Sequence, residues 1–501
     1  MNAPHNHSRR SFLLNSAGAS LSLALRNQGL ASAGAFATSL AAMGTAAAHS
    51  VGAGSPYKAL VCLFMYGGND SHNWVYPFDP TSHNAYAAAR GGIYNASNNP
   101  AGLALAAGGN AMAASNITDG RQFTTAPLLG PLRSLYDQGK LAVLANVGPM
   151  VSPTTLAQYR AKSIELPPKL FSHNDQQSIW QASAPEGARY GWAGRMGDLL
   201  MSANSQPVFT SISVTGNTVL LAGRDVVQYQ VGVNGSVSLS GVGANAMNST
   251  TGSSRALEAM QAAGITAMQT EHARVLTRSK ATDTVFKNSV LANNTSFDSR
   301  LALPTTTYSN TPLGQPPFMD QDNLLQQLRM VAQIISKHSA IGARRQVFMV
   351  SIGGFDTHAN QNRDESILMQ RVAGGVKYFT DAMAALNLAD NIALFTASDF
   401  GRTTVSNGKG SDHGWGATHF IAGGIGGTGA RAVKGQNIYG TIPPAGLGHD
   451  WDVGSGRLLP TTSVDQYAAT LGKWFGLDAA DLATVLPKLT NYTTKDLGFM
   501  A

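Results

Sequence analysis

Five short segments combine carboxylate and imidazole side chains with glycines, at residues 66–73, 171–175, 353–358, 398–402 and 411–416. Neutral imidazoles and carboxylate oxygens are ligands that suit Zn²⁺, Mn²⁺ or Mg²⁺. Neighbouring glycines let the backbone approach an ion or a phosphate without a Cβ clash. Two such ions about 4 Å apart can hold an oxyanion ester and lower the pKa of a bound hydroxyl. The segments therefore predict a site for one or two divalent ions with hydrolytic chemistry.

Each segment taken alone also fits a structural role. An aspartate beside paired glycines, such as Asp356, is common in turns. Arg402 can fork onto a phosphate or sulfate oxygen, but it can equally pair with a structural carboxylate. Three of the segments, however, come directly after predicted strands. This recurrence favours a shared metal site over three unrelated turns.

The elements that must position these residues alternate between strands and helices. Short apolar runs predict buried strands at residues 59–65, 141–146, 347–352 and 392–396. Helical patterns cover residues 322–337 and 368–386, and a capping box at 463–466 opens a further helix that Gly476 ends. The alternation predicts an α/β fold with a largely parallel central sheet and helices on both faces. Open sheets of this kind bind ligands beyond the carboxyl ends of their strands.

Residues 205–310 differ from the rest of the predicted domain, which spans residues 57–501. Alternating apolar residues around Gly216 and Asn217 predict a β-hairpin, and residues 255–292 have a helical pattern. We therefore expect a small insertion or subdomain, made of a hairpin and helices, on the main sheet.

The N-terminus carries the pattern of an export signal. Arg9 and Arg10 precede an apolar stretch that begins at Phe12, and residues 46–48 are a plausible cleavage site. We expect a twin-arginine (Tat) signal peptide over residues 1–48, the Tat machinery as a partner, and a periplasmic or secreted protein. A permanent anchor and a cytoplasmic chain with a basic start are alternatives. We expect no stable membrane span after cleavage. The uncharged stretch at residues 29–48 is mostly Ala, Gly and Ser, so it is only weakly apolar for a membrane span.

Composition excludes several classes of protein and site. Cys62 is the only cysteine among 501 residues, so an intramolecular disulfide, a zinc site of the CxxC type and a Cys-ligated iron–sulfur cluster are ruled out. Its place in an apolar run predicts a buried small hydrophobe. Beyond residue 48 the chain has 32 basic and 28 acidic residues. This scattered charge argues against a nucleic-acid partner.

Several of these segments together resemble a known family. Residues 61–70, 353–358, 398–403 and 412–416, supported by 171–180 and 456–475, are similar to the bacterial domain of unknown function family 1501. The resemblance covers residues 57–476, and Tat-type starts are frequent in that family. The family is grouped with the alkaline phosphatase and sulfatase superfamily, which implies a three-layer sandwich with metal at the strand ends.

The resemblance implies roles for individual residues. Asp70 is implied as the ligand after the first strand. Asp356 and His358 would hold one ion, which His413 completes. Asp399, where many relatives carry Glu, would hold the other.

The nucleophile is the least determined part of the expected site. Hydrolases of this superfamily use Ser, Thr or formylglycine at the start of a helix, and Ser172 is best placed for that role. It can equally serve only as a helix N-cap, and Ser71 is the other candidate. Formylglycine is disfavoured because the Pro and Arg of its modification motif do not follow Cys62.

The expected function is that of an exported, metal-dependent hydrolase of phosphate or sulfate esters. Zn or Mn is expected rather than Mg. His173, Arg402 and Lys409 would contact the oxyanion, and Ser172 or a metal-bound hydroxide would attack. The substrate would be a small anionic ester or a sulfated or phosphorylated polymer. The alternative is an exported binding or assembly protein on the same fold with little or no catalysis.

Overall fold

The computed structural model describes residues 55–236, 266–308, 319–424 and 432–501. The predicted signal peptide at residues 1–48 lies outside these ranges. Within them, no helix is both long and apolar enough to cross a bilayer.

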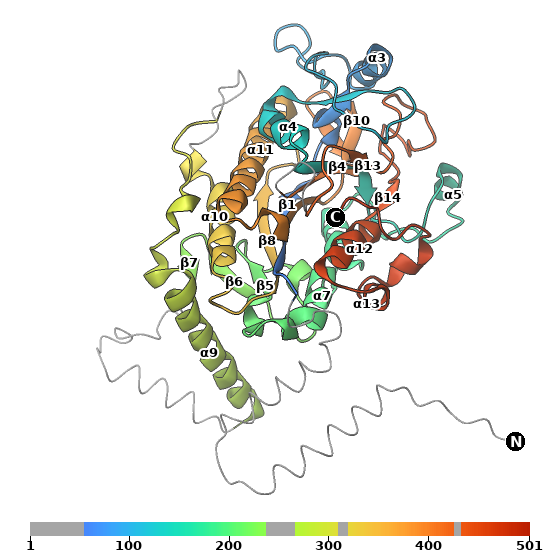
Figure 1. Cartoon of the computed structure of the whole chain (residues 1–501). Helices are drawn as coiled ribbons and strands as arrows, with labels where there is room; N and C mark the ends of the chain where they lie inside the picture. The colour runs from blue at the N-terminus through green and yellow to red at the C-terminus, as the bar shows by residue number, and fades with distance from the viewer. Residues whose placement is uncertain (1–54, 237–265, 309–318, 425–431) are drawn as a thin grey trace, which may run out of the picture. The chain divides into compact units, whose positions relative to one another are not determined.

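A mixed, largely parallel sheet forms the centre of the fold (Figure 1). Nine of its ten described strands follow the order β13-β4-β12-β9-β1-β8-β5-β6-β7, and β14 also pairs with β4. Only β12 and β7 run antiparallel to their neighbours. The strands are β1 (Lys58–Tyr66), β4 (Leu141–Gly148), β5 (Ser211–Ser213), β6 (Tyr229–Gly232), β7 (Gly235–Ser236), β8 (Arg345–Gly353), β9 (Ile392–Ser398), β12 (Ala417–Ala422), β13 (Ile438–Tyr439) and β14 (Thr462–Ser463).

Helices cover both faces of this sheet (Figure 1). Alternate residues of β1 point to opposite faces, because successive side chains of a strand alternate. One set, including Val61 and Leu63, packs with α4 (Gly130–Asp137), α10 (Asn323–Ser336) and α11 (Gln361–Ala385). The other set, including Cys62, packs with α7 (Trp192–Leu200), α12 (Val464–Phe475) and α13 (Ala479–Val485). The predicted α/β class and the burial of Cys62 are confirmed.

The four predicted strands fall within β1, β4, β8 and β9. The predicted capping box at 463–466 and the predicted start of the helix near residue 322 are confirmed as well. The Asp322 carboxylate accepts a hydrogen bond from Leu324 N at the start of α10, and Ser463 and Gln466 form the capping box of α12. Helix α11 begins earlier than predicted because its first turns carry buried polar residues, among them Gln361 and Glu365. An apolar pattern cannot reveal such residues.

The stretch at residues 205–310 joins the edge of the main sheet. Strand β5 pairs in parallel with β8 and β6, and β6 and β7 form the hairpin. The predicted hairpin around Gly216 and Asn217 is wrong. There the chain instead turns away to Gln181, whose Oε1 accepts hydrogen bonds from the Thr218 hydroxyl and from Leu220 N. The helical prediction is confirmed over α9 (Ala267–Val285), and residues 237–265 lie outside the described ranges.

Smaller elements surround the carboxyl edge of the sheet. Two small two-stranded sheets are among them. One is formed by β2 (Val75–Pro77) and β3 (Phe123–Thr125), and the other by β10 (Arg402–Ser406) and β11 (Ser411–His413). The helices are α3 (Pro80–Ala89), α5 (Leu156–Ala161) and α6 (His173–Ala182).

The sheet order brings three of the predicted segments to one place. Strands β9, β1 and β8 are neighbours, with Met65 opposite Ser398 and Tyr66 opposite Gly353. The chain therefore leaves all three strands at the same level, just before Asp399 and Asp356. Because β12 runs in the opposite direction, it begins at this edge, and the residues before it, including His413, arrive there too.

Candidate metal centre

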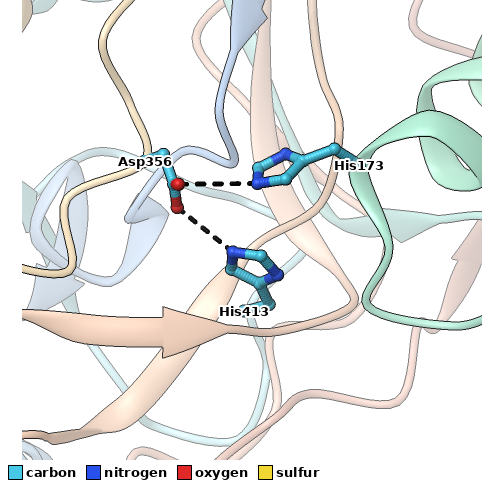
Figure 2. A group of neighbouring side chains, drawn as sticks. All are labelled: His173, Asp356 and His413. Atoms are coloured by element: carbon cyan, nitrogen blue, oxygen red, sulfur yellow. Dashed lines mark hydrogen bonds and ion pairs between the residues drawn. The ribbon is translucent and has the colours of Figure 1, made fainter.

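Three side chains from distant parts of the chain meet at this edge (Figure 2). His173 begins α6, Asp356 follows β8, and His413 ends β11. One ligand atom from each lies within 4.8 Å of the others. Asp356 Oδ1 is 3.1 Å from His413 Nε2, and Asp356 Oδ2 is 3.5 Å from His173 Nε2. Bonds of about 2.1 Å to a tetrahedral zinc ion place neighbouring ligand atoms about 3.4 Å apart, so the group fits such an ion.

His358 adds a fourth side chain to this group. Its Nε2 is 2.9 Å from His413 Nε2 and 3.1 Å from Asp356 Oδ1. The side chains of His358 and Asp356 are each 44% exposed, so the group is open to solvent on one side.

The hydrogen-bond partners of the His413 and His358 rings indicate which ring nitrogens donate. His413 Nδ1 lies 2.8 Å from the carbonyl oxygen of Phe171, which can only accept, so Nδ1 donates a proton. Burial lowers the pKa of His413, which keeps the ring neutral and leaves a lone pair on Nε2. His358 Nδ1 lies 3.1 Å from the Asp412 carboxylate, so this nitrogen is a donor as well. When both rings are neutral, the two Nε2 lone pairs and the Asp356 oxygen face one another, and a cation among them would relieve their repulsion.

The backbone of Phe171 contributes to this geometry. Its φ of 72° lies in the left-handed region, which bulky residues rarely adopt. In that conformation its carbonyl accepts the bond from His413, and the chain enters α6 at Ser172, one residue before His173. Such strain clusters at functional sites. The Arg457 guanidinium stacks 5.4 Å from the Phe171 ring and donates to the carbonyl of His413, which further fixes both segments.

Asp399 lies behind the ring of His173, on the side away from Asp356. Its Oδ2 accepts from His173 Nδ1 at 2.7 Å, from Gln177 Nε2 at 2.7 Å and from Gly67 N at 3.2 Å. The hydrogen bond to Asp399 raises the pKa of His173. A carboxylate on the far nitrogen of a ligating histidine orients the ring and makes it more basic. The other carboxylate oxygen of Asp399, Oδ1, has no hydrogen-bond partner among the described residues. Direct ligation by Asp399 stays a prediction.

Arg402 is buried and is used within the protein. Its Nη1 donates to Asp356 Oδ1 at 2.7 Å and to the Gly67 carbonyl at 3.1 Å. Its Nε and Nη2 donate to Ser411. Burial opposes ionisation of Asp356, but the hydrogen bond and charge of Arg402 outweigh it and lower the pKa of that carboxyl. These contacts suit a group that holds Asp356 better than one that reaches out to an oxyanion.

Asp70 is not part of this group. It is fully buried and forms a two-pronged ion pair with the buried Arg90 guanidinium, and Gln361 also donates to its carboxylate. The structure therefore brings together Asp356, His358, His413 and His173, with Asp399 one step behind, and leaves Asp70 apart.

The candidate nucleophiles and Lys409 make contacts of their own. The Ser172 hydroxyl donates to Asp175 Oδ2 at 3.2 Å and does not cap the backbone of α6. Ser71 is buried, and its Oγ accepts from Thr418 N at 2.9 Å. Lys409 lies exposed in the turn between β10 and β11.

Two contributors were missed from the sequence. Gln177 stands four residues after His173, so helical spacing places both on one face of α6, and this signal was available. The Phe171 carbonyl carries no sequence signal. His173 was expected to contact the oxyanion, whereas its Nε2 is directed at the proposed ion position.

A family model described as "Protein of unknown function (DUF1501)" matches residues 57–486. A search of curated proteins finds no match. Among solved structures, the crystal structure of Ps i-CgsB in complex with k-i-k-neocarrahexaose is 10% identical, with a TM-score of 0.32. The alignment covers 87% of this chain and 77% of that one. A TM-score this low supports no argument about fold or function.

Proposed function

The chain belongs to the DUF1501 family of proteins of unknown function, and we propose that it is an exported, metal-dependent hydrolase of phosphate or sulfate esters. The observation that carries the proposal is the convergence of ring lone pairs on the Asp356 carboxylate. A divalent cation is the simplest partner for three acceptor atoms that face one another. Imidazole ligands favour Zn²⁺ or Mn²⁺ over Mg²⁺.

His173, Asp356, His358 and His413 would hold the ion, and their surroundings already fix them. Asp399 and the Phe171 carbonyl set the tautomers of His173 and His413. When bound, such an ion would supply Lewis-acid polarisation of an ester oxygen. The exposed side of the group would admit either a small anionic ester or a sulfated or phosphorylated polymer.

Ser172 is the nucleophile that we propose. It precedes His173, and its hydroxyl already donates to a buried carboxylate, Asp175. That carboxylate is able to accept the proton when the serine oxygen attacks phosphorus or sulfur and the ester's alcohol leaves, and water would then hydrolyse the serine ester. Ser172→Ala should lower kcat by at least about 100-fold if this assignment is right. A decrease in kcat of less than about threefold would mean that water, and not Ser172, attacks the ester.

Two parts of the proposal reach beyond the site. We propose that the fold is the alkaline phosphatase-like sandwich, which helices on both faces of a largely parallel sheet support. We also propose export by the Tat route to the periplasm or beyond. Replacing both Arg9 and Arg10 with Lys in the full chain should leave the protein in the cytoplasm, which cell fractionation would measure.

Metal analysis tests the central claim. Protein expressed from the full chain and purified from the export compartment should contain about one Zn or Mn per chain. Asp356→Asn and His413→Ala should lose it, whereas Asp381→Asn, a change at an exposed carboxylate, should not. The wild type should turn over an aryl phosphate or an aryl sulfate.

The outcomes separate the two functions. Bound metal without turnover across ester panels would favour the binding or assembly protein. Equal metal content in Asp356→Asn and Asp381→Asn would refute the site itself. Where metal is bound, a chelator should lower the Tm of the wild type, because ligand at 100 times its Kd stabilises by about 2.7 kcal/mol. Asp356→Asn should show no such shift.

A further inference from the structure

A chain of buried hydrogen bonds links the Asp70–Arg90 ion pair to Asp356. Arg402 Nε donates to Ser411 Oγ at 3.3 Å, and Ser411 Oγ donates to Gln361 Oε1 at 2.6 Å. Gln361 Nε2 then donates to Asp70 Oδ2. At the other end, Arg402 Nη1 donates to Asp356 Oδ1 at 2.7 Å. We call Arg402, Ser411, Gln361 and Asp70 the relay.

The relay is shielded from solvent along its length. Asp70, Gln361, Ser411 and Arg402 are each at most 1% exposed. Hydrogen bonds in such surroundings are electrostatically stronger than in water, and aligned bonds polarise one another. Side chains at 1% exposure also have little room to move, so loss of one link is felt by the next.

The direction of the bonds is the same at every step. The cationic guanidinium of Arg402 is the donor at one end, and the anionic carboxylate of Asp70 is the acceptor at the other. The polarised serine and glutamine between them carry part of the negative field of Asp70 towards Arg402. Arg90 in turn balances the charge of Asp70.

We propose that Asp70, acting through Gln361 and Ser411, is a positioning residue that holds the Arg402 guanidinium against Asp356. This inference rests on the metal site proposed above, in which Asp356 is a ligand. It gives the carboxylate that follows β1 a role without ligation. It also explains why Gln361 and Ser411, which are not among the four proposed metal ligands, are buried and hydrogen-bonded to each other.

The test cuts the relay without leaving a buried charge unpaired. Gln361→Met and Ser411→Ala each remove one hydrogen-bonded link of the relay, and each new side chain has a volume similar to the one it replaces. Gln333→Met is the matched control, because Gln333 is a buried glutamine of α10 that also bonds through both amide atoms, to Asp298 N and the Val290 carbonyl.

Two measurements on the full chain are made side by side. One is the affinity for Co²⁺ and the visible spectrum of the Co²⁺ form. The other needs no metal: hydrogen exchange of the Arg402 Nε–H, followed by NMR and assigned by its loss in Arg402→Lys.

Gln361→Met and Ser411→Ala should weaken Co²⁺ binding about 10-fold, the low end for partners behind a ligand, and change the spectrum. In Gln361→Met, exchange of the Arg402 Nε–H should be at least about 10-fold faster, although Gln361 does not contact that group. Gln333→Met should change neither.

The inference is overturned if exchange at Arg402 is the same in Gln361→Met and wild type, or if Gln333→Met accelerates it equally. Direct ligation by Asp70 would instead appear as loss of Co²⁺ in Asp70→Asn with normal affinity in Gln361→Met. If the wild type binds no Co²⁺, the proposed metal site is refuted. The exchange measurement would still test whether the relay positions Arg402.

Discussion

Glu365 supplies a prediction whose size follows from the structure. It lies on α11 with 3% of its surface exposed, and Trp74 Nε1 donates to its Oε2 at 3.3 Å. Its Oε1 has no hydrogen-bond partner among the described residues. Burial, with a smaller contribution from Asp70, raises the pKa of Glu365 from 4.5 to about 8. The side chain is therefore protonated at neutral pH in the folded protein.

The sign of the effect on stability follows from proton linkage. Between pH 4.5 and about 8, the folded chain holds this proton and the unfolded chain does not. Unfolding then releases a proton, so the free energy of unfolding falls as the pH rises. Each pH unit in this window is worth about 1.4 kcal/mol. Glu365→Gln removes the titrating group and this loss with it.

Denaturant unfolding of wild type and Glu365→Gln at pH 5 and pH 7 measures the effect. The difference in free energy of unfolding between them should grow by about 2.5 kcal/mol over those two pH units, in favour of the variant. Comparing the two pH values cancels any constant effect of the amide. Glu271→Gln, at a carboxylate 59% exposed, is the control and should show no such growth. A difference that stays constant within about 1 kcal/mol would refute the reasoning.

Two further predictions concern the surroundings of the proposed site. Asp70→Asn leaves the Arg90 guanidinium buried without its counter-charge, so the free energy of unfolding should fall by about 3–5 kcal/mol; a loss below about 1 kcal/mol in chemical denaturation would contradict the ion pair. Gly410→Ala would put a Cβ 2.1 Å from the carbonyl oxygen of Thr357, whereas a Cβ at Gly353 meets nothing within 4 Å. Gly410→Ala should therefore weaken metal binding in an equilibrium titration and Gly353→Ala should not, and equal affinities would show that the β10–β11 turn does not hold His358.

The local elements could be predicted because their causes are local. The apolar runs of β1, β4, β8 and β9 are buried on both faces, so they stand out in the sequence without any knowledge of their neighbours. The caps at Asp322 and Ser463 work through residues only two or three positions away. The hairpin around Gly216 failed because a distant side chain, Gln181, binds that segment.

Membership of the site was predicted only in part. Asp356, His358 and His413 carry types and flanking glycines that name them as candidates. Asp70 has the same signature, yet Arg90, 20 residues later, occupies its carboxylate. Nothing in the local sequence distinguishes a carboxylate that will meet a cation from one that will meet an arginine.

The sequence by itself determined the four central strands, several helices and the residue types that could serve as metal ligands, because these depend on side-chain type and on neighbours a few positions away. Only the tertiary structure decided which of those residues meet. Sheet order and strand direction bring His413 and Asp356 to one edge, while helix α6 delivers His173 to the same point. The contacts at this point join residues up to 242 positions apart, and their energies depend on burial and on partners that exist only once the chain is folded.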